Sequence, residues 1–208
     1  EATPLVGTLG RACYAPCETE CTRTKLEGPV PIRLIKRFAA DHHYEGTTPD
    51  GPAIEVAEPN GRTVAIVGSG PAGLTAAWQL ARKGYQVTIL VKREQPGGYL
   101  RHAIPAYRLP HEVVDADIAN LTSLGVQIRC NAAVSDPEAL KAEGYDAVIM
   151  ATGTQVATRM DVPGEDADGS VNGLDFLDAV ANGAAPDLTG KRVVVVGGGN
   201  VAMDAARV

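Results

Sequence analysis

The chain has 208 residues, 45% of them hydrophobic, and a formal net charge of −6. A chain of this length buries a substantial core and suggests one or two domains. The acidic balance, with no basic stripe, argues against nucleic acid as the main partner, and no apolar run approaches the length of a membrane span. Because the sequence also lacks a signal peptide at its start, we expect a cytoplasmic protein.

Closely spaced cysteines dominate the amino-terminal segment. Cys13, Cys17 and Cys21 follow a C-x3-C-x3-C spacing. Without a secretory signal, such a cluster is more typical of metal or cluster ligands than of disulfides, and soft thiolates suit iron–sulfur clusters or zinc. Three thiolates are one short of a closed four-thiolate site, so a further ligand must come from elsewhere. A zinc site and three free, buried thiols remain alternatives.

The residues after the cysteines predict a helix and then a connector. Residues 29–40 have the spacing of an amphipathic helix, with Leu34, Ile35 and Phe38 on one face. The residues that follow, through 61, are rich in Pro, Gly and Asp, which is typical of a connector. We therefore expect a small helical unit that is joined to the rest of the chain by a linker.

A strand–turn–helix pattern follows the connector. Residues 63–67 are β-branched or apolar and lead directly into Gly68-x-Gly70-x-x-Gly73. In such a fingerprint the first glycine permits a tight turn, the second lets a pyrophosphate approach the backbone, and the third lets the helix pack closely on the strand. The helix that starts near Pro71 points its free N–H groups at the phosphate. The pattern therefore predicts a dinucleotide-binding turn.

The second strand departs from this fingerprint at one position. Residues 84–91 form a nearly continuous apolar run, as expected of a buried parallel strand. An acidic residue usually ends this strand and binds the ribose hydroxyls, but Val91 stands there, followed by Lys92 and Arg93. Either Glu94 replaces the acid from the loop, or the basic residues face a phosphate.

Two further turns of small residues are candidates for ligand contact. Gly97 and Gly98 together permit close approach of the backbone to a flat ligand. A strand predicted over residues 146–150 leads into the turn from Ala151 to Gly153. This turn would sit at the carboxyl edge of the sheet, where open α/β sheets bind ligands.

The remaining patterns predict core elements. Residues 110–125 predict an amphipathic helix, residues 126–130 a strand and residues 171–180 another helix. Cys130 is interpreted as a small core residue rather than a ligand. The apolar stripe of the first helix, which we assign to the core, comprises Val114, Ile118, Leu121 and Leu124.

A second fingerprint lies near the carboxyl end of the sequence. Residues 191–196 predict a buried strand, which leads into Gly197-x-Gly199-x-x-Ala202 and a helix. This repeat of the first strand–turn–helix pattern implies two dinucleotide sites in one polypeptide. Two such sites joined by small-residue turns suit a flavoprotein that takes hydride from a nicotinamide.

The order of these motifs resembles one known family. The motifs are Leu9-Gly-Arg-Ala-Cys13, Val67-Gly-Ser-Gly-Pro-Ala-Gly73, Gly97-Gly98-Tyr-Leu-Arg101, Ile104-Pro-Ala-Tyr-Arg-Leu-Pro110, Ala151-Thr-Gly153 and Gly197-Gly-Gly-Asn-Val-Ala-Met-Asp204. With these motifs, nearly the whole chain resembles the small (β) subunit of glutamate synthase and its relatives, which include the amino-terminal half of dihydropyrimidine dehydrogenase.

The resemblance implies an α/β fold: a Rossmann-like FAD domain with the start of a second, inserted NAD(P)-binding Rossmann domain, preceded by a small α-helical iron–sulfur segment. It implies FAD on the first fingerprint, NAD(P)H on the second, and two 4Fe–4S clusters in the helical segment. The corresponding boundaries are 1–45 for the helical segment, 46–61 for the linker, 62–160 for the FAD domain and 161–208 for the start of the NAD(P) domain. Because both nucleotide domains would be incomplete, we expect a segment of a longer protein.

The resemblance also assigns site residues by position. The FAD pyrophosphate would be held by Gly68, Ser69, Gly70, Pro71, Ala72 and Gly73. Val91 occupies the place of the ribose acid. The flavin would be approached or backed by Gly98, Leu100, Arg101, Ala151, Thr152 and Gly153. The nicotinamide dinucleotide would meet Gly197, Gly199, Asn200 and Val201. Ligands divided between both clusters, an incomplete set in this chain, would be Cys13, Cys17 and Cys21.

The leading hypothesis is an oxidoreductase that passes electrons from NAD(P)H through FAD to iron–sulfur clusters and then to a partner subunit or domain. No catalytic side chain is required, because the cofactors carry the chemistry. The alternative is a non-catalytic cofactor-binding or docking module of a larger redox complex. A zinc-bearing scaffold is a third hypothesis.

Overall fold

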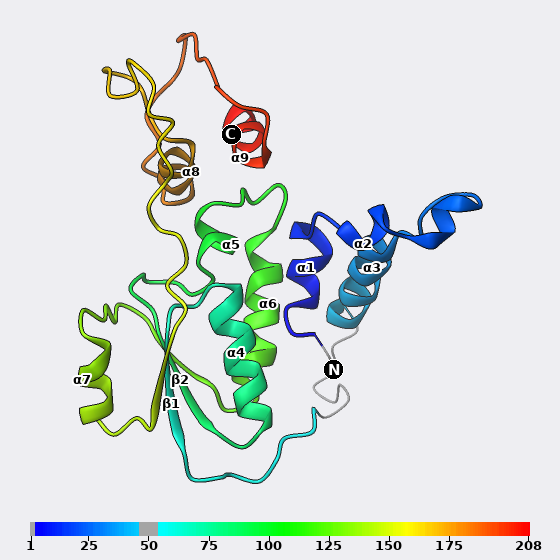
Figure 1. Cartoon of the computed structure of the whole chain (residues 1–208), viewed down its shortest axis with the longest axis vertical. Helices are drawn as coiled ribbons and strands as arrows, with labels where there is room; N and C mark the ends of the chain where they lie inside the picture. The colour runs from blue at the N-terminus through cyan, green and yellow to red at the C-terminus, as the bar shows by residue number, and fades with distance from the viewer. Residues whose placement is uncertain (1–2, 46–53) are drawn as a thin grey trace.

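A parallel β-sheet organises the molecule (Figure 1). The computed structural model describes residues 3–45 and 54–208. Within them, the sheet has the strand order β3-β2-β1-β4, and all neighbouring strands are parallel. The strands are β1 (Thr63–Val67), β2 (Gln86–Leu90), β3 (Gln127–Arg129) and β4 (Ala147–Met150). Each lies in a segment where the sequence predicts a strand, so the predicted α/β fold with a parallel sheet is confirmed.

Helices α4 (Pro71–Arg82) and α6 (His111–Thr122) cover one face of this sheet (Figure 1). The core that they form with the strands includes Val64, Ile66, Leu74, Ile89, Val114 and Leu121. The predicted stripe of α6 lies in this core: Ile118 is buried with it and Leu124 packs against it half-buried. Cys130 also packs at its margin, where burial raises the pKa of the thiol.

The opposite face carries the shorter helix α7 (Pro137–Ala142), which lies across the strands from α4 (Figure 1). Its Leu140 packs with Ala65, Val67 and Leu90, whose side chains alternate with those of the first face. The carboxylate of Asp136 caps α7 by accepting a hydrogen bond from the backbone N–H of Glu138 at 3.0 Å. Helices on both faces are the arrangement that a parallel sheet requires to bury its strands.

The amino-terminal residues form a helical unit that contacts α6 (Figure 1). The unit comprises α1 (Val6–Ala12), α2 (Pro16–Thr19), the 3-10 helix η1 (Thr22–Lys25) and α3 (Ile32–Glu45). Asp117 of α6 accepts hydrogen bonds from the backbone N–H groups of Gly7 and Thr8, at 3.3 and 2.7 Å. The first N–H groups of a helix have no partner within it, so this buried carboxylate caps α1 from another element.

The helix predicted over residues 29–40 is present, with later bounds. α3 starts after the prolines and extends beyond residue 40, so part of the predicted connector is helical. Residues 46–53 of the predicted linker lie outside the described residues. Gly10 lets α1 and α3 approach closely, since a Cβ there would lie 2.7 Å from the Cα of Arg37. The predicted apolar face of α3 is exposed, most strongly at Phe38.

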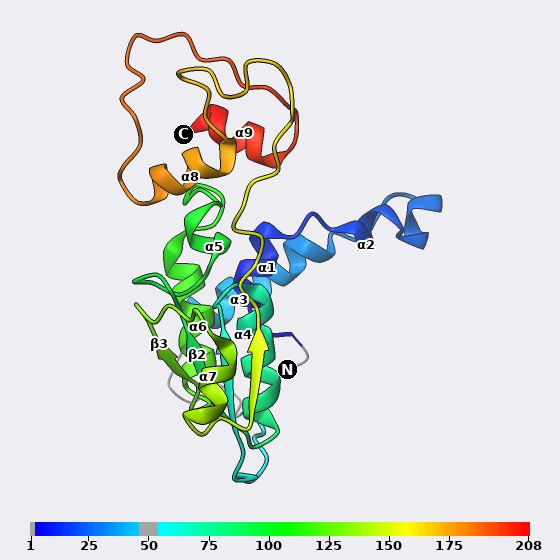
Figure 2. The same cartoon turned by 60° about the vertical axis from the view of Figure 1, so that its left-hand side comes forward.

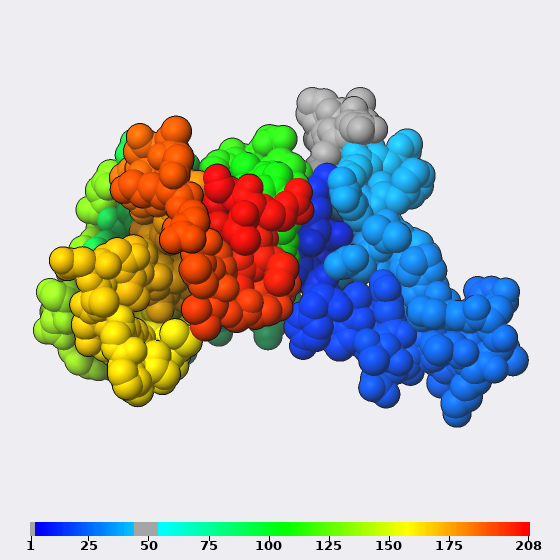
Figure 3. Space-filling view, turned by 90° about the horizontal axis from the view of Figure 1, so that it is seen from above, coloured from blue at the N-terminus to red at the C-terminus, as the bar shows by residue number. Residues whose placement is uncertain are grey.

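The carboxyl-terminal residues carry two helices that lie beyond the carboxyl end of the sheet. α8 (Gly173–Ala181) and α9 (Asn200–Arg207) pack together, and α8 contacts α5 (Tyr99–His102) (Figure 2). Seen from above, α9 (red) lies beside the orange and yellow segments that precede it in the chain (Figure 3). α8 confirms the helix predicted over residues 171–180. Among residues 3–45 and 54–208, no helix combines the length and apolar character needed to cross a membrane.

The strand predicted over residues 191–196 is wrong. These residues have no regular secondary structure, and Val194 is 85% exposed. A strand is stabilised by hydrogen bonds to a neighbour, and the described sheet contains only β1 to β4, none of which pairs with this segment. The apolar run is therefore present without the partner that would convert it into a strand.

Candidate functional site

The first glycine fingerprint forms the turn between β1 and α4. Gly68 has a φ of +108°, and a Cβ on it would lie 2.2 Å from the carbonyl oxygen of Ala151. A Cβ on Gly73 would lie 2.0 Å from the carbonyl oxygen of Gly68. Both contacts are far shorter than real side chains make, so these positions require glycine. Gly73 thus has the predicted role of letting α4 pack closely on the strand.

Gly70 differs from its two neighbours in the motif. No atom lies within 4 Å of the place where its Cβ would be, so the backbone there is open. It is the N-cap of α4, with Pro71 in the first turn, and the first N–H groups of the helix have no partner within it. The positive end of the helix dipole and this bare backbone together suit a pyrophosphate.

The turn at Gly97 and Gly98 packs against this loop. The backbone N–H of Gly97 donates to Oγ of buried Ser69 at 3.1 Å. Gly98 has a φ of +56°, and a Cβ on it would lie 3.0 Å from the Cα of Gly70. The structure therefore brings together two motifs for which the sequence predicts ligand contact, through the Ser69 hydroxyl and the backbone of the glycines.

The turn after β4 joins the same edge. The hydroxyl of Tyr99 in α5 donates to the carbonyl oxygen of Thr154 at 2.5 Å, which ties the glycine turn to the segment that leaves the sheet. Ala151 is half-buried beside the fingerprint, whereas Thr152 and Gly153 are exposed. The three predicted turns thus lie along the carboxyl edge of the parallel strands, the usual place of ligands in open α/β sheets.

Leu100 and Arg101 are held by protein contacts. Leu100 is buried in the core between the sheet and helices α4 and α6. The guanidinium of Arg101 is buried, pairs with Asp115 of α6, and donates through Nε to the carbonyl oxygen of Pro96 at 3.1 Å. Both side chains fix α5 against its neighbours, so contact of either with a flavin stays a prediction.

Val91 is a buried core residue, and its N–H donates to the carbonyl oxygen of Arg129 at 2.9 Å. The polar groups lie in the loop just beyond it. There Arg93 pairs with Asp178 of α8 at 2.8 Å, and Nδ1 of His102, at the end of α5, lies 4.0 Å from the same carboxylate. Burial, and then the charge of Arg93, lower the pKa of His102.

These loop residues border a pocket of about 290 Å³. Its lining comprises Arg93, Glu94, Gln95, Arg101, His102, His111, Ala181 and Asn182. The apolar Val91 at the usual position of the acid led us to predict a role for Arg93 and Glu94 in ligand binding. The sequence did not predict that the end of α8 lines the same pocket. That contact depends on how a distant helix packs.

The second fingerprint keeps the backbone features of a dinucleotide turn without the strand. Gly197 has a φ of +123°, and Gly199 is the N-cap of α9 with no atom within 4 Å of its Cβ position. Asn200 and Val201, which begin α9, are exposed. The open glycine at a helix amino end resembles the arrangement at Gly70.

The three predicted metal ligands lie on the helical unit. Cys13 and Cys21 are half-buried, whereas Cys17 is exposed, so the alternative of three buried thiols is wrong. The backbone N–H groups of Val30 and then Arg23 lower the pKa of Cys21. In the described part of the chain, no three His, Cys, Asp or Glu side chains converge to hold a metal ion. Within the described residues, the three cysteines do not form a complete ligand set for a 4Fe–4S cluster.

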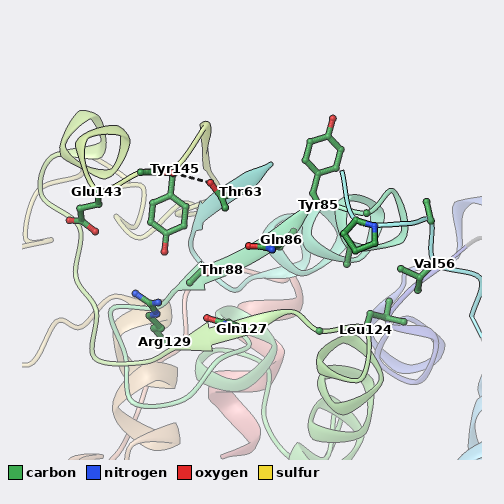
Figure 4. A pocket seen from close by; sticks show the side chains of 17 residues that line it. Val56, Thr63, Tyr85, Gln86, Thr88, Leu124, Gln127, Arg129, Glu143 and Tyr145 are labelled. Atoms are coloured by element: carbon green, nitrogen blue, oxygen red, sulfur yellow. Dashed lines mark hydrogen bonds between the residues drawn. The ribbon is translucent and has the colours of Figure 1, made fainter. Parts of the chain in front are cut away.

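A larger pocket, of about 510 Å³, lies at the opposite edge of the sheet (Figure 4). Its lining includes Thr63, Gln86 and Gln127, each the first residue of its strand. At this edge the N–H of Thr63 donates to the carboxylate of Asp146 at 2.7 Å, which lowers the pKa of that carboxyl. Because ligands of open α/β sheets bind at the carboxyl ends of the strands, the candidate site is the glycine edge and not this pocket.

Comparison with known proteins agrees with the site. Residues 62–208 match the model of a family described as pyridine nucleotide-disulphide oxidoreductase. The chain is 41% identical to the NADP(+)-dependent formate dehydrogenase subunit beta of Moorella thermoacetica, covering 100% of this chain and 32% of that protein. It is 39% identical to an NAD-dependent dihydropyrimidine dehydrogenase subunit PreT homolog of Salmonella typhi, covering 95% of this chain and 49% of that protein. The chain thus spans about a third to about half of the length of these relatives.

A solved structure shares the fold. The FprA protein of Mycobacterium tuberculosis in complex with NADPH superposes with a TM-score of 0.62 and 31% identity, over 72% of this chain and 36% of that one. The match to a dihydropyrimidine dehydrogenase subunit confirms the resemblance on which the sequence motifs were interpreted.

Proposed function

Because the chain belongs to the pyridine nucleotide-disulphide oxidoreductase family, we propose that it forms part of a flavoprotein oxidoreductase. NAD(P)H is the proposed electron donor, FAD the group bound by this chain, and a partner subunit or domain the acceptor. The observation that carries the proposal is the open backbone of Gly70 at the amino end of α4, between two glycines that admit no side chain. That surface suits the pyrophosphate of a dinucleotide.

The proposed FAD site occupies the glycine edge of the sheet. Its pyrophosphate-binding residues are Gly68, Ser69, Gly70, Pro71, Ala72 and Gly73. Gly98, Leu100, Arg101, Ala151, Thr152 and Gly153 are proposed to surround the flavin half. Because Val91 is apolar and buried, we assign the ribose contact to the following loop, where Arg93 and Glu94 line the smaller pocket.

The proposed NAD(P)H site lies at the amino end of α9, on Gly197, Gly199, Asn200 and Val201. The glycine edge would hold FAD, which would supply the acceptor for the hydride and its two electrons from NAD(P)H, leaving NAD(P)⁺. In this proposal the chain contributes by binding and orienting the two dinucleotides. No acidic or basic side chain is assigned a catalytic role.

We divide the chain into a helical segment (1–45), a linker (46–61), an FAD-binding unit (62–160) and the start of an NAD(P)-binding unit (161–208). The named relatives are subunits of larger redox enzymes, which supports an acceptor on another subunit or domain. We assign no electron-transfer step to Cys13, Cys17 and Cys21, since the described residues hold no complete ligand set.

The proposal is tested by adding FAD to the flavin-free full chain and then adding NADPH or NADH without oxygen. We expect FAD to bind and its absorption to bleach when the nicotinamide is added. Binding without bleaching by either nucleotide would favour a non-catalytic cofactor-binding module. Failure to bind FAD would refute the proposal outright.

A further inference from the structure

A buried carboxylate links α9, the helix of the second glycine fingerprint, to the loop between α5 and α6. Asp204 of α9 is only 5% exposed. Its Oδ1 accepts a hydrogen bond from the hydroxyl of Tyr107 at 2.7 Å, and its Oδ2 pairs with the guanidinium of Arg108. Both partners lie in the loop between α5 and α6, almost a hundred residues earlier in the sequence. The guanidinium of Arg207, also in α9, lies 4.2 Å from the centre of the Tyr107 ring.

The chemistry of this junction favours one arrangement. A carboxylate removed from water is costly unless it is paired and hydrogen-bonded, and here both oxygens have partners. Burial, and then the hydrogen bond to Asp204, raise the pKa of Tyr107, so its hydroxyl stays protonated and donates. The Tyr107 hydroxyl and the Arg108 guanidinium each contact a different oxygen of Asp204. Because both contacts must be kept, they restrict the rotation of α9 about its axis as well as its distance from the loop.

A second ion pair joins these parts, and its carboxylate is more exposed. Arg93 and Asp178 pair at 2.8 Å between the loop after β2 and α8, but both side chains are about one-third exposed. An ion pair in contact with water contributes little, because solvent screens it. Of the two acids that make these pairs, Asp204 is the more buried, with a side chain 7% exposed against 33% for Asp178, while its partner Arg108 is 30% exposed.

The junction connects the two candidate sites by a short path. Gly98 packs on Gly70 and is the N-cap of α5. The loop with Arg108 follows α5 directly and contacts Asp204, and α9 begins at Asn200, about one turn before Asp204, with Gly199 as its N-cap. Figures 1 and 2 show α5 lying between the sheet and the pair of helices α8 and α9.

We propose that Asp204, Tyr107 and Arg108 are positioning residues that fix the amino end of α9, and with it the nicotinamide site, relative to the glycine edge that holds FAD. This inference rests on the proposed function. Hydride transfer depends steeply on the placement of its partners, so a shift of about 1 Å lowers its rate on the order of a hundredfold. Tight binding of each dinucleotide alone does not require the junction.

The test uses the full chain loaded with FAD. Asp204→Asn keeps the size of the side chain and removes its charge, Tyr107→Phe removes only the hydroxyl, and Asp175→Asn changes an exposed acid of α8 as a matched control. Rapid mixing with NAD(P)H without oxygen separates the rate of flavin reduction from the nucleotide concentration that gives half of that rate. Hydrogen exchange of residues 105–110 and 200–207 reports whether the junction opens, independently of activity.

We expect Asp204→Asn to lower the rate of flavin reduction by about tenfold or more, with FAD content and half-saturating nucleotide changed by no more than about twofold. Exchange should speed up in both segments, and chemical reduction of the flavin by dithionite should be unaffected. Arg108→Lys, which keeps the charge, should retain more of the rate than Arg108→Gln.

An unchanged reduction rate in Asp204→Asn would overturn the inference, as would unchanged hydrogen exchange or the same rate loss in Asp175→Asn. Loss of FAD together with the rate would also overturn it, because the junction would then support folding and not placement. If the unmodified chain is not reduced by NAD(P)H at all, the proposed function fails. Even then, hydrogen exchange of residues 105–110 and 200–207 decides whether Asp204 holds α9 in place.

Discussion

Changing two glycines of the first fingerprint to alanine should have two different effects. Gly73→Ala should reduce the stability of the fold, whereas Gly70→Ala should weaken FAD binding. In Gly73→Ala the new Cβ would lie 2.0 Å from the carbonyl oxygen of Gly68, where real contacts below 3.0 Å essentially never occur. The clash is with backbone, so α4 must move off the loop, at a cost of about 1–3 kcal/mol in the free energy of unfolding.

Gly70→Ala should leave the flavin-free fold alone. Its φ of −70° suits alanine, and no atom lies within 4 Å of the new methyl group. The free energy of unfolding should change by less than about 0.5 kcal/mol. The methyl group would nevertheless occupy the space through which a pyrophosphate reaches the backbone. Loss of one hydrogen bond to a charged group costs about 1.5–3 kcal/mol, which weakens FAD binding by roughly tenfold or more.

Urea unfolding of the flavin-free variants and fluorescence titration with FAD measure the two quantities separately. We expect Gly70→Ala to be as stable as the unmodified chain but to bind FAD weakly, and we expect Gly73→Ala to be destabilised. Wild-type affinity for FAD in Gly70→Ala would refute the assignment of the pyrophosphate to this turn. Wild-type stability in Gly73→Ala would refute the close packing of α4.

Two further changes test other contacts. Asp117→Ala leaves the N–H groups of Gly7 and Thr8 buried without an acceptor. We expect this change to lower the free energy of unfolding by about 1–3 kcal/mol and to speed proteolysis within residues 3–45. An unchanged cleavage rate would contradict the capping of α1 by Asp117. The pKa of His102 is lowered below its ordinary value of 6.5, so the unfolded chain takes up the proton first and stability should decrease as the pH falls below that value. His102→Gln should flatten this dependence in urea unfolding between about pH 8 and pH 5.5, and an equally steep dependence in the variant would assign the effect to other groups.

The sequence predicted those features that depend on short stretches of chain. Strand β1 and the turn at Gly68 follow from a local apolar run and a glycine spacing, and the four strands lie where such runs occur. The run at residues 191–196 has the same appearance but forms no strand. A strand depends on a neighbour that its own residues do not encode.

Contacts between distant side chains could not be predicted in this way. The cap of α1 by Asp117 and the pairing of Asp204 with Arg108 each join residues about a hundred positions apart. Nothing in the spacing around either aspartate distinguishes it from a solvent-exposed acid on a helix. The glycine positions of the site were therefore predictable, whereas the polar junctions that hold it together required the packed structure.

The proposed function requires two separate dinucleotide sites in this chain. Gly199→Ala tests this directly, since the backbone there is open and its φ of −80° accepts alanine. The decisive measurement is the bleaching of bound FAD by NAD(P)H without oxygen in this variant and in the unmodified chain. The account predicts that Gly199→Ala binds FAD as tightly as the unmodified chain but needs about tenfold or more NAD(P)H for the same bleaching. Equal bleaching at equal NAD(P)H, or loss of FAD from the variant, would contradict it.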